Sequence, residues 1–339
     1  MSWLSEAPKV ELHCHLEGAT TPETYLQLAR ENGVNLPFTT VAEGERYFQY
    51  KNLVHFLEVY HTCTTAIRKP EDFYLLVDRF AKSRADENIR YCEFFVSLAL
   101  HILHEVNPEE ALSVIARACR QAEIKYNIKL RCIPDVSRDR DVGVALDALK
   151  ATIRKKSEYI IGLGLGGSER GDSKRFAGIF QTAADSGLRV VAHAGEWKDT
   201  QVIWDVVRNL NVERIGHGIT AVKDPQLMDF LAITQIPIEV CPMSNIRVGL
   251  VDRFANHPIL EMERRGLNVT VHSDDPTMFD TTLTDELCLL MGELGEARTV
   301  GFLRRNINAS FLPYIDKKAY FDELNGYLMK AGVLVHVQA

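Results

Sequence analysis

The sequence of 339 residues lacks the features of secreted and membrane proteins. Its seven cysteines are scattered, are mostly set in apolar runs and form no CxxC pair, so we expect buried, reduced thiols. Residues 1–6 contain neither a basic region nor an apolar core, and no apolar run approaches the ~18 residues of a membrane span. These absences predict a cytoplasmic protein without a membrane partner.

Positive charge is also scarce. The chain has 39 Lys and Arg against 46 Asp and Glu, a formal net charge of −7. Because binding to a nucleic-acid backbone requires clustered cations, we expect a small soluble substrate and no nucleic-acid partner. Hydrophobic residues make up 46% of the chain, enough for a large core in one large domain or two medium ones; the barrel inferred below predicts a single domain over residues 1–339. The composition leaves the oligomeric state open.

Eight short runs rich in β-branched residues recur along the chain, separated by segments with helical periodicity. Each run is nearly continuously apolar, as in parallel strands that are buried on both faces. Strand and helix alternating eight times predict a (β/α)8 TIM barrel, with a doubly wound open sheet as the alternative. The expected strands are residues 9–17, 89–97, 129–137, 159–167, 188–196, 214–219, 236–244 and 268–275.

Helix start and stop signals support this alternation. Thr21 before Pro22 predicts a helix start, and Gly33 predicts its end. Residues 36–67 are rich in aromatics and too long for a plain crossover, so we expect a helical lid inserted after the first strand. His55 lies in this segment and is a candidate site residue if the lid covers the site.

Histidines at strand ends predict a metal site. Catalytic residues of barrel enzymes gather at the carboxyl ends of the strands. His13 and His15 lie two residues apart near the end of the first expected strand, so they project to the same face and can share one ion. His193 ends the fifth strand, and Glu196 follows it across an Ala-Gly turn. A metal ligand beside a general acid or base is the minimum needed to activate water.

The eighth strand ends in two adjacent aspartates, Asp274 and Asp275. At a buried strand end these carboxylates repel each other and lose hydration, a conflict that a divalent cation resolves. Asp274 is therefore the expected fourth ligand beside His13, His15 and His193. Three histidines and one carboxylate leave a position for water, which is typical of a catalytic zinc, and we expect one Zn²⁺ per chain.

Two strand ends that contain glycine indicate a function less specifically than the histidine and aspartate motifs do. His217 lies between Gly216 and Gly218, which suits either close approach of a ligand or a tight turn with an incidental histidine. The GLGLGG run at 162–167 matches GxGxxG, but it does not open a βαβ unit at the start of the chain, so a dinucleotide site is not expected. The exposed backbone of Gly166 and Gly167 instead suits a planar ligand.

Five motifs together resemble the adenosine deaminase family of the amidohydrolase superfamily, in order and over nearly the whole chain. They are KVELHCHLEG at 9–18, HAGE at 193–196, RIGHG at 214–218, CPMSN at 241–245 and SDDP at 273–276. The resemblance implies a zinc barrel that replaces the 6-amino group of a purine by oxygen and releases ammonia. It is unlike the cytidine-type zinc deaminases, whose H-x-E and P-C-x-x-C signature is absent.

The resemblance also implies roles for individual residues. It assigns zinc to His13, His15, His193 and Asp274, and it gives His217 and Asp274 the task of orienting the attacking water and accepting its proton. It makes Glu196 the proton donor to N1 of the purine. Asp275 would hold N7, and the amide of Gly167 would hold N3.

Two positions depart from the adenosine pattern. Glu17 stands where classical adenosine deaminases have an Asp that meets the 5′ region of the ribose, and Gly164-Leu165-Gly166-Gly167-Ser168 replaces an Asp-Leu-Ala-Gly-Asp type strand. We expect a purine nucleoside first, adenosine or 6-aminodeoxyfutalosine, with Glu17 at its 5′ end. Free adenine is the alternative, and another metal-dependent amidohydrolase reaction is a further one. An anionic 5′ arm would need a cation, and the available ones are Lys51, Arg68, Lys69 and Arg170.

Overall fold

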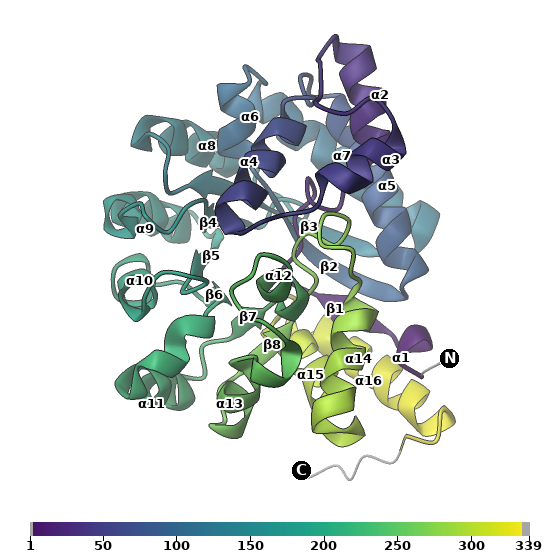
Figure 1. Ribbon diagram of the computed structural model, residues 1–339, viewed down its shortest axis with the longest axis vertical. Helices are drawn as coiled ribbons and strands as arrows, with labels where there is room; N and C mark the ends of the chain where they lie inside the picture. Colours follow the sequence, from purple (N-terminus) through teal and green to yellow (C-terminus); the bar gives the residue numbers. More distant parts are fainter. Residues whose placement is uncertain (1–2, 334–339) are drawn as a thin grey trace.

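Eight parallel strands form a nearly closed barrel in the computed structural model, which describes residues 3–333. Each strand pairs with the next along the chain, and the helices between them surround the strands (Figure 1). The predicted (β/α)8 barrel is confirmed. The strands are β1 (Lys9–Glu11), β2 (Ile89–Val96), β3 (Lys129–Ser137), β4 (Gly162–Gly166), β5 (Arg189–Ala194), β6 (Arg214–His217), β7 (Ile238–Val240) and β8 (Val269–Val271).

The barrel closes beyond the ends of β8 and β1 rather than along them. The amide of His15 donates to the Asp274 carbonyl at 2.8 Å, and the amide of Asp274 donates to the His13 carbonyl at 3.1 Å. Several strands are shorter than expected because the functional segments leave the regular ladder. Asp274 and His217 have φ angles of 61° and 62°, which a continuing strand does not allow.

The helices lie outside the strands, as the alternating pattern predicted. Thr21 caps α2 by accepting from the amide of Thr24, and Gly33 ends it at a φ of 65°. The helices are α1 (Trp3–Glu6), α2 (Pro22–Asn32), α3 (Val41–Tyr47), α4 (Leu53–Thr64), α5 (Asp72–Asp86), α6 (Leu98–Leu103), α7 (Pro108–Tyr126), α8 (Val142–Lys155), α9 (Ala177–Asp185), α10 (Thr200–Asp205), α11 (Pro225–Thr234), α12 (Pro242–Arg247), α13 (Ile259–Arg264), α14 (Leu283–Leu294), α15 (Glu296–Ala309) and α16 (Tyr314–Lys330). Short turns are η1 (Ser173–Phe176), η2 (Val206–Leu210), η3 (Ile219–Lys223) and η4 (Phe254–Asn256).

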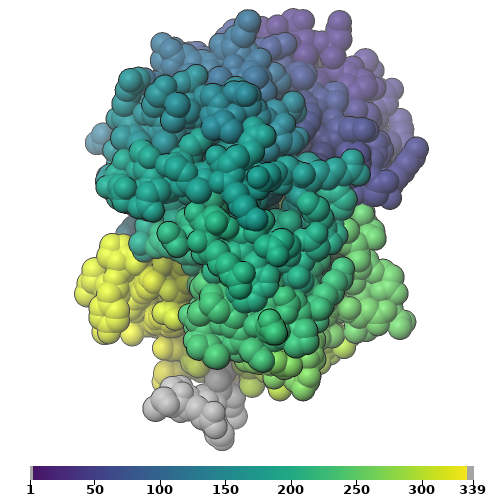
Figure 2. All heavy atoms as spheres, turned by 90° about the vertical axis from the view of Figure 1, so that its left-hand side faces the viewer, coloured from purple at the N-terminus to yellow at the C-terminus, as the bar shows by residue number. Residues whose placement is uncertain are grey.

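The insertion between β1 and β2 carries helices α3 and α4, within the segment expected to form a lid. It lies with α2 at the upper end of the molecule in both views, and the yellow C-terminal part of the chain lies at the lower end (Figures 1 and 2). The seven cysteines are free thiols, and six of them are buried. Within residues 3–333, no helix combines the length and the apolar character needed to cross a membrane.

A small apolar cluster fills the barrel interior below the strand ends. It consists of Phe95, Ile133 and Val191, all with no exposed surface. The ring of Phe95 contacts His13, His15 and His193, with centroids 4.9, 5.1 and 5.3 Å away. This packing limits the freedom of the histidine rings and holds them at the carboxyl ends of the strands.

Candidate metal centre and active site

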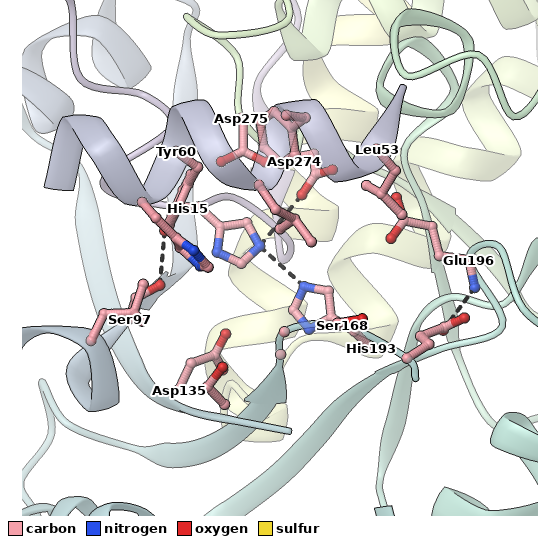
Figure 3. A pocket seen from close by; sticks show the side chains of 18 of the residues that line it. His15, Leu53, Tyr60, Ser97, Asp135, Ser168, His193, Glu196, Asp274 and Asp275 are labelled. Carbon is pink, nitrogen blue, oxygen red and sulfur yellow. Dashed lines mark hydrogen bonds and ion pairs between the residues drawn. The ribbon is translucent and has the colours of Figure 1, made fainter. Parts of the chain in front are cut away.

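Three histidine nitrogens and one carboxylate oxygen converge at the carboxyl ends of β1, β5 and β8. The Nε2 atoms of His15 and His193 are 3.1 Å apart (Figure 3). The Nε2 atoms of His13 and His15 each lie 3.4 Å from Oδ1 of Asp274. A tetrahedron with metal–ligand bonds of about 2.0–2.1 Å has edges of roughly 3.4 Å, so these donor atoms fit a zinc-sized ion.

The far sides of the His13 and His193 rings are held by hydrogen bonds, so that their Nε2 atoms face the centre. Nδ1 of His13 lies 2.8 Å from the carboxylate of Glu239, and Nδ1 of His193 lies 3.1 Å from the Leu165 carbonyl. Among residues 3–333, the buried Nε2 of His13 has no hydrogen-bond partner. Such outer contacts fix the tautomer of a metal-binding histidine, so the donor set fits a divalent metal.

Glu239 is itself held by a buried cation. Arg214 Nε lies 2.5 Å from Oε1 of Glu239, and Arg214 Nη2 lies 2.5 Å from Glu93. Burial acts to raise the pKa of Glu239, but the charges of Arg214 and His13 outweigh it and lower this pKa to about 2. Glu239 is therefore an anion below His13. Glu239 was not identified from the sequence, although a single charged residue inside an apolar strand could have indicated a functional role.

His217 joins the same centre from β6. One ring nitrogen lies within 4.8 Å of donor atoms of His13, His193 and Asp274. The flanking glycines have separate functions: a Cβ at Gly216 would lie 2.8 Å from the His13 ring, whereas Gly218 has a φ of 62°. At Gly216, therefore, the group that approaches the backbone closely is the ring of His13, one of the proposed metal ligands.

Glu196 lines the cavity from the loop after β5 (Figure 3). This loop is held by Glu169, whose carboxylate accepts from the amides of Glu196, Trp197 and Lys198 at 3.0 to 3.2 Å. Burial, followed by the negative charges of Asp274 and Glu169, raises the pKa of Glu196 well above its ordinary value. A carboxyl group with a raised pKa is better suited to donating a proton. Glu169 was also missed from the sequence.

Asp275 and Gly167 line the same cavity. Gly18 makes room for Asp275, because a Cβ at Gly18 would lie 1.7 Å from its Oδ1. Gly167 has a φ of 78°, and a Cβ there would lie 2.5 Å from the Ser137 hydroxyl. Both predicted ligand-binding positions thus face the cavity beside the metal cluster.

Glu17 lies apart from this set. Its side chain has no exposed surface and does not line the cavity. Its carboxylate accepts from the Ser97 amide at 2.9 Å and from Tyr60 at 3.1 Å, and it lies 2.8 Å from His101 Nε2. Glu17 therefore joins the insertion helix α4 to the barrel in this structure. The contacts of His101 also show a structural use for a histidine that the sequence left unassigned.

The cavity extends from the metal cluster to the insertion helix. Besides the residues above, its lining includes Leu53, Phe56, Leu57, Tyr60 and His61 from α4, Ser97, Ala99 and Leu100 near α6, and Asp135, Val136 and Ser137 at the end of β3. His61 lines the cavity. His55, the histidine expected in the lid, instead accepts a hydrogen bond from the amide of Lys51, which precedes α4. Arg170, one of the expected cations, stacks over Trp197.

Comparison with known proteins places the chain among purine-related deaminases. The adenosine deaminase family model matches residues 8–327. An adenine deaminase of Albidiferax ferrireducens is 33% identical over 326 residues, covering 95% of this chain and 94% of that protein. An aminodeoxyfutalosine deaminase of Streptomyces avermitilis is 33% identical and covers 96% and 92%. The crystal structure of adenine deaminase from Arthrobacter aurescens superposes with a TM-score of 0.91 at 30% identity, covering 95% and 99%.

Proposed function

Since this chain belongs to the adenosine deaminase family, we propose that it is a zinc-dependent hydrolase that deaminates a 6-aminopurine, with free adenine as its preferred substrate. One observation carries the chemistry. Three histidine nitrogens and one carboxylate oxygen, spaced 3.1 to 3.4 Å apart where the structure gives distances, adjoin the same cavity as the partly buried acid Glu196. Together these groups provide a metal site and a proton donor for hydrolysis.

The ligands in this proposal are His13, His15, His193 and Asp274. A zinc ion bound there supplies a Lewis acid that makes water acidic enough to act as a nucleophile near neutral pH. Zinc fits because the donors are nitrogen and oxygen atoms spaced for tetrahedral coordination.

In this proposal, the residues around the centre transfer protons and position the substrate. His217 and Asp274 accept the proton of the attacking water and keep the water facing C6. Glu196 gives its proton to N1, which makes C6 more electrophilic. Asp275 at N7 and the Gly167 amide at N3 hold the ring in the plane that this attack requires.

Support for adenine over a nucleoside comes from two sides. Relatives named adenine deaminase are 32–36% identical to the chain and match it over 86–96% of its length, so they favour the alternative over the nucleoside that we ranked first from the sequence. In addition, Glu17, the acceptor expected at the sugar, has its carboxylate engaged by Ser97, Tyr60 and His101. A sugar hydroxyl would have to break these buried contacts to reach it.

A nucleoside with an extended 5′ end is the second candidate. The relative named aminodeoxyfutalosine deaminase matches the chain over a similar length. The cavity also continues beyond the metal cluster between α4 and α6, past Leu57 and Leu100. This continuation offers mainly apolar contacts to a substituent larger than ribose.

The test is to measure kcat/KM of the zinc-loaded protein separately with adenine, adenosine and aminodeoxyfutalosine, following ammonia release and the change in ultraviolet absorbance. We expect adenine to be preferred by at least roughly tenfold, a difference of about 1.4 kcal/mol. A preference for either nucleoside would refute adenine as the substrate, and turnover of none of the three would refute the deaminase proposal.

A further inference from the structure

Asp135 at the end of β3 is a buried acid that the proposed chemistry leaves unused. Its side chain lines the cavity and is 4% exposed. Among residues 3–333, its Oδ1 atom has no hydrogen-bond partner. Oδ1 is enclosed against Gly164, whereas Oδ2 adjoins Gly166, which lines the cavity, so a donor on a ligand would meet Oδ2.

Two glycines of β4 make the space that Asp135 occupies. A Cβ at Gly164 would lie 1.7 Å from Oδ1 of Asp135, and a Cβ at Gly166 would lie 3.1 Å from Oδ2. Any other residue at position 164 would displace the carboxyl group. The unusual glycine content of this strand is therefore matched to the acid on its neighbour, β3, with which Gly164 is in register.

The position of Asp135 relates it to one edge of the proposed ligand. It adjoins Gly166, next to the Gly167 amide that would hold N3. Glu196, the proposed donor to N1, lies on a different side of the pocket (Figure 3). In a purine, C2 lies between N1 and N3, whereas N9 follows N3 on the side away from N1. In the proposed ligand position, Asp135 would therefore lie toward the N3–N9 edge, and its carboxylate also lies within 4.8 Å of ring nitrogens of His15 and His193.

We infer that Asp135 accepts a hydrogen bond from N9–H of the free base and is a specificity-determining residue for adenine. The inference rests on the proposed function and deepens it. A nucleoside carries a carbon substituent at N9, so it lacks this donor and would leave the Asp135 carboxyl group buried without a partner. A site built around such a hydrogen bond discriminates strongly against an analogue that lacks the donor.

The experiment compares adenine with 9-methyladenine, in which a methyl group replaces the N9 hydrogen and so removes the donor, on wild type and on Asp135→Ala. For wild type we expect kcat/KM to be higher for adenine. In Asp135→Ala the ratio of the two kcat/KM values should fall by at least roughly tenfold, or about 1.4 kcal/mol, because the variant loses the contact only with adenine. Asp135→Asn keeps the size and a weaker acceptor, so its ratio should lie between the other two.

Ser137→Ala is the matched control, because Ser137 lines the same cavity two residues along β3 and its hydroxyl contacts Asp139. Its ratio should equal that of wild type. An unchanged ratio in both Asp135 variants, or an equal loss of activity toward adenine and adenosine, would overturn the inference while leaving adenine deamination intact. Loss of bound zinc from Asp135→Ala would overturn it too, because the acid would then act on the metal. Wild type that does not turn over adenine refutes the proposed function and the inference with it.

Discussion

At the scale of single residues, the centre contains backbone that most residues avoid. His217 and Asp274 both have φ angles near 60°, in the left-handed region. Such conformations cost about 1–3 kcal/mol each and persist only where the surroundings determine them. Here the left-handed turn at Asp274 is held by the segment that follows β1, because the Asp274 amide donates to the His13 carbonyl and the Asp274 carbonyl accepts from the His15 amide. The backbone strain thus directs a carboxylate at the metal position.

Glu196→Gln separates proton transfer from metal binding. Glutamine preserves the size of the side chain but cannot donate the proton that the raised pKa of Glu196 makes available. We expect kcat to fall by roughly 10²–10⁴-fold, while bound zinc stays at the wild-type level because Glu196 lies outside the donor set. Steady-state kinetics and metal analysis check this. A variant that keeps a tenth or more of the wild-type kcat would show that another group donates the proton.

At the scale of elements, the loops after β1 and β8 are fitted to each other. Gly18 lies in the first loop, its carbonyl accepts from the Met278 amide at 3.1 Å, and Asp275 packs where a Cβ of residue 18 would stand. The insertion helix α4 is attached at the same place, through Tyr60 and Glu17. The position of Asp275 and that of helix α4 therefore both depend on the short loop that follows β1.

Gly18→Ala tests this fit. The added methyl would lie 1.7 Å from Oδ1 of Asp275 and must displace that residue. Because a displacement of about 1 Å can cost roughly 10²-fold in rate, we expect a loss of this order in kcat/KM together with about 1–3 kcal/mol of stability. Gly178→Ala is the control, since no atom lies within 4 Å of its added methyl in α9. The control should keep full activity and gain about 0.5–1 kcal/mol. Equal behaviour of the two variants would contradict the fit.

At the scale of the whole molecule, the proposed metal links strands that are far apart in the sequence. Its ligands come from the ends of β1, β5 and β8, and β8 and β1 are joined there by only a short bridge. An ion that binds the folded state and not the unfolded chain stabilises the fold by mass action. The barrel closure is therefore a place where metal binding and stability are coupled.

Removing the metal by chelation should lower Tm, and adding zinc should restore it. With free zinc at one hundred times Kd, the expected gain is about 2.7 kcal/mol. Thermal unfolding followed with and without zinc measures the shift. His15→Ala, which lacks one ligand, should show a much smaller zinc-dependent shift. The same Tm for wild type in both conditions would mean that no ion binds at this centre.

The alternation of apolar runs with helical segments was sufficient to predict the barrel, and the placing of histidines and an aspartate at strand ends predicted that His13, His15, His193 and Asp274 lie near one another. This worked because strand ends of a parallel barrel meet at one face, and because residues two apart on a strand share a side. Strand lengths could not be predicted in the same way. The left-handed turns at His217 and Asp274 end regular pairing early, and they depend on hydrogen bonds between segments distant in the sequence.

Only the tertiary structure showed which buried carboxyl groups are already hydrogen-bonded within the protein and which could contact a substrate. From the sequence, Glu17 looked like a ligand for the substrate, yet three donors from other segments surround it. Asp135 was not identified from the sequence, yet it lines the cavity, glycines on the next strand make room for its carboxyl group, and within residues 3–333 its Oδ1 has no hydrogen-bond partner. The physical reason is that a carboxylate's role depends on the donors and charges packed around it. In a barrel those neighbours come from segments whose contacts are not encoded in local spacing.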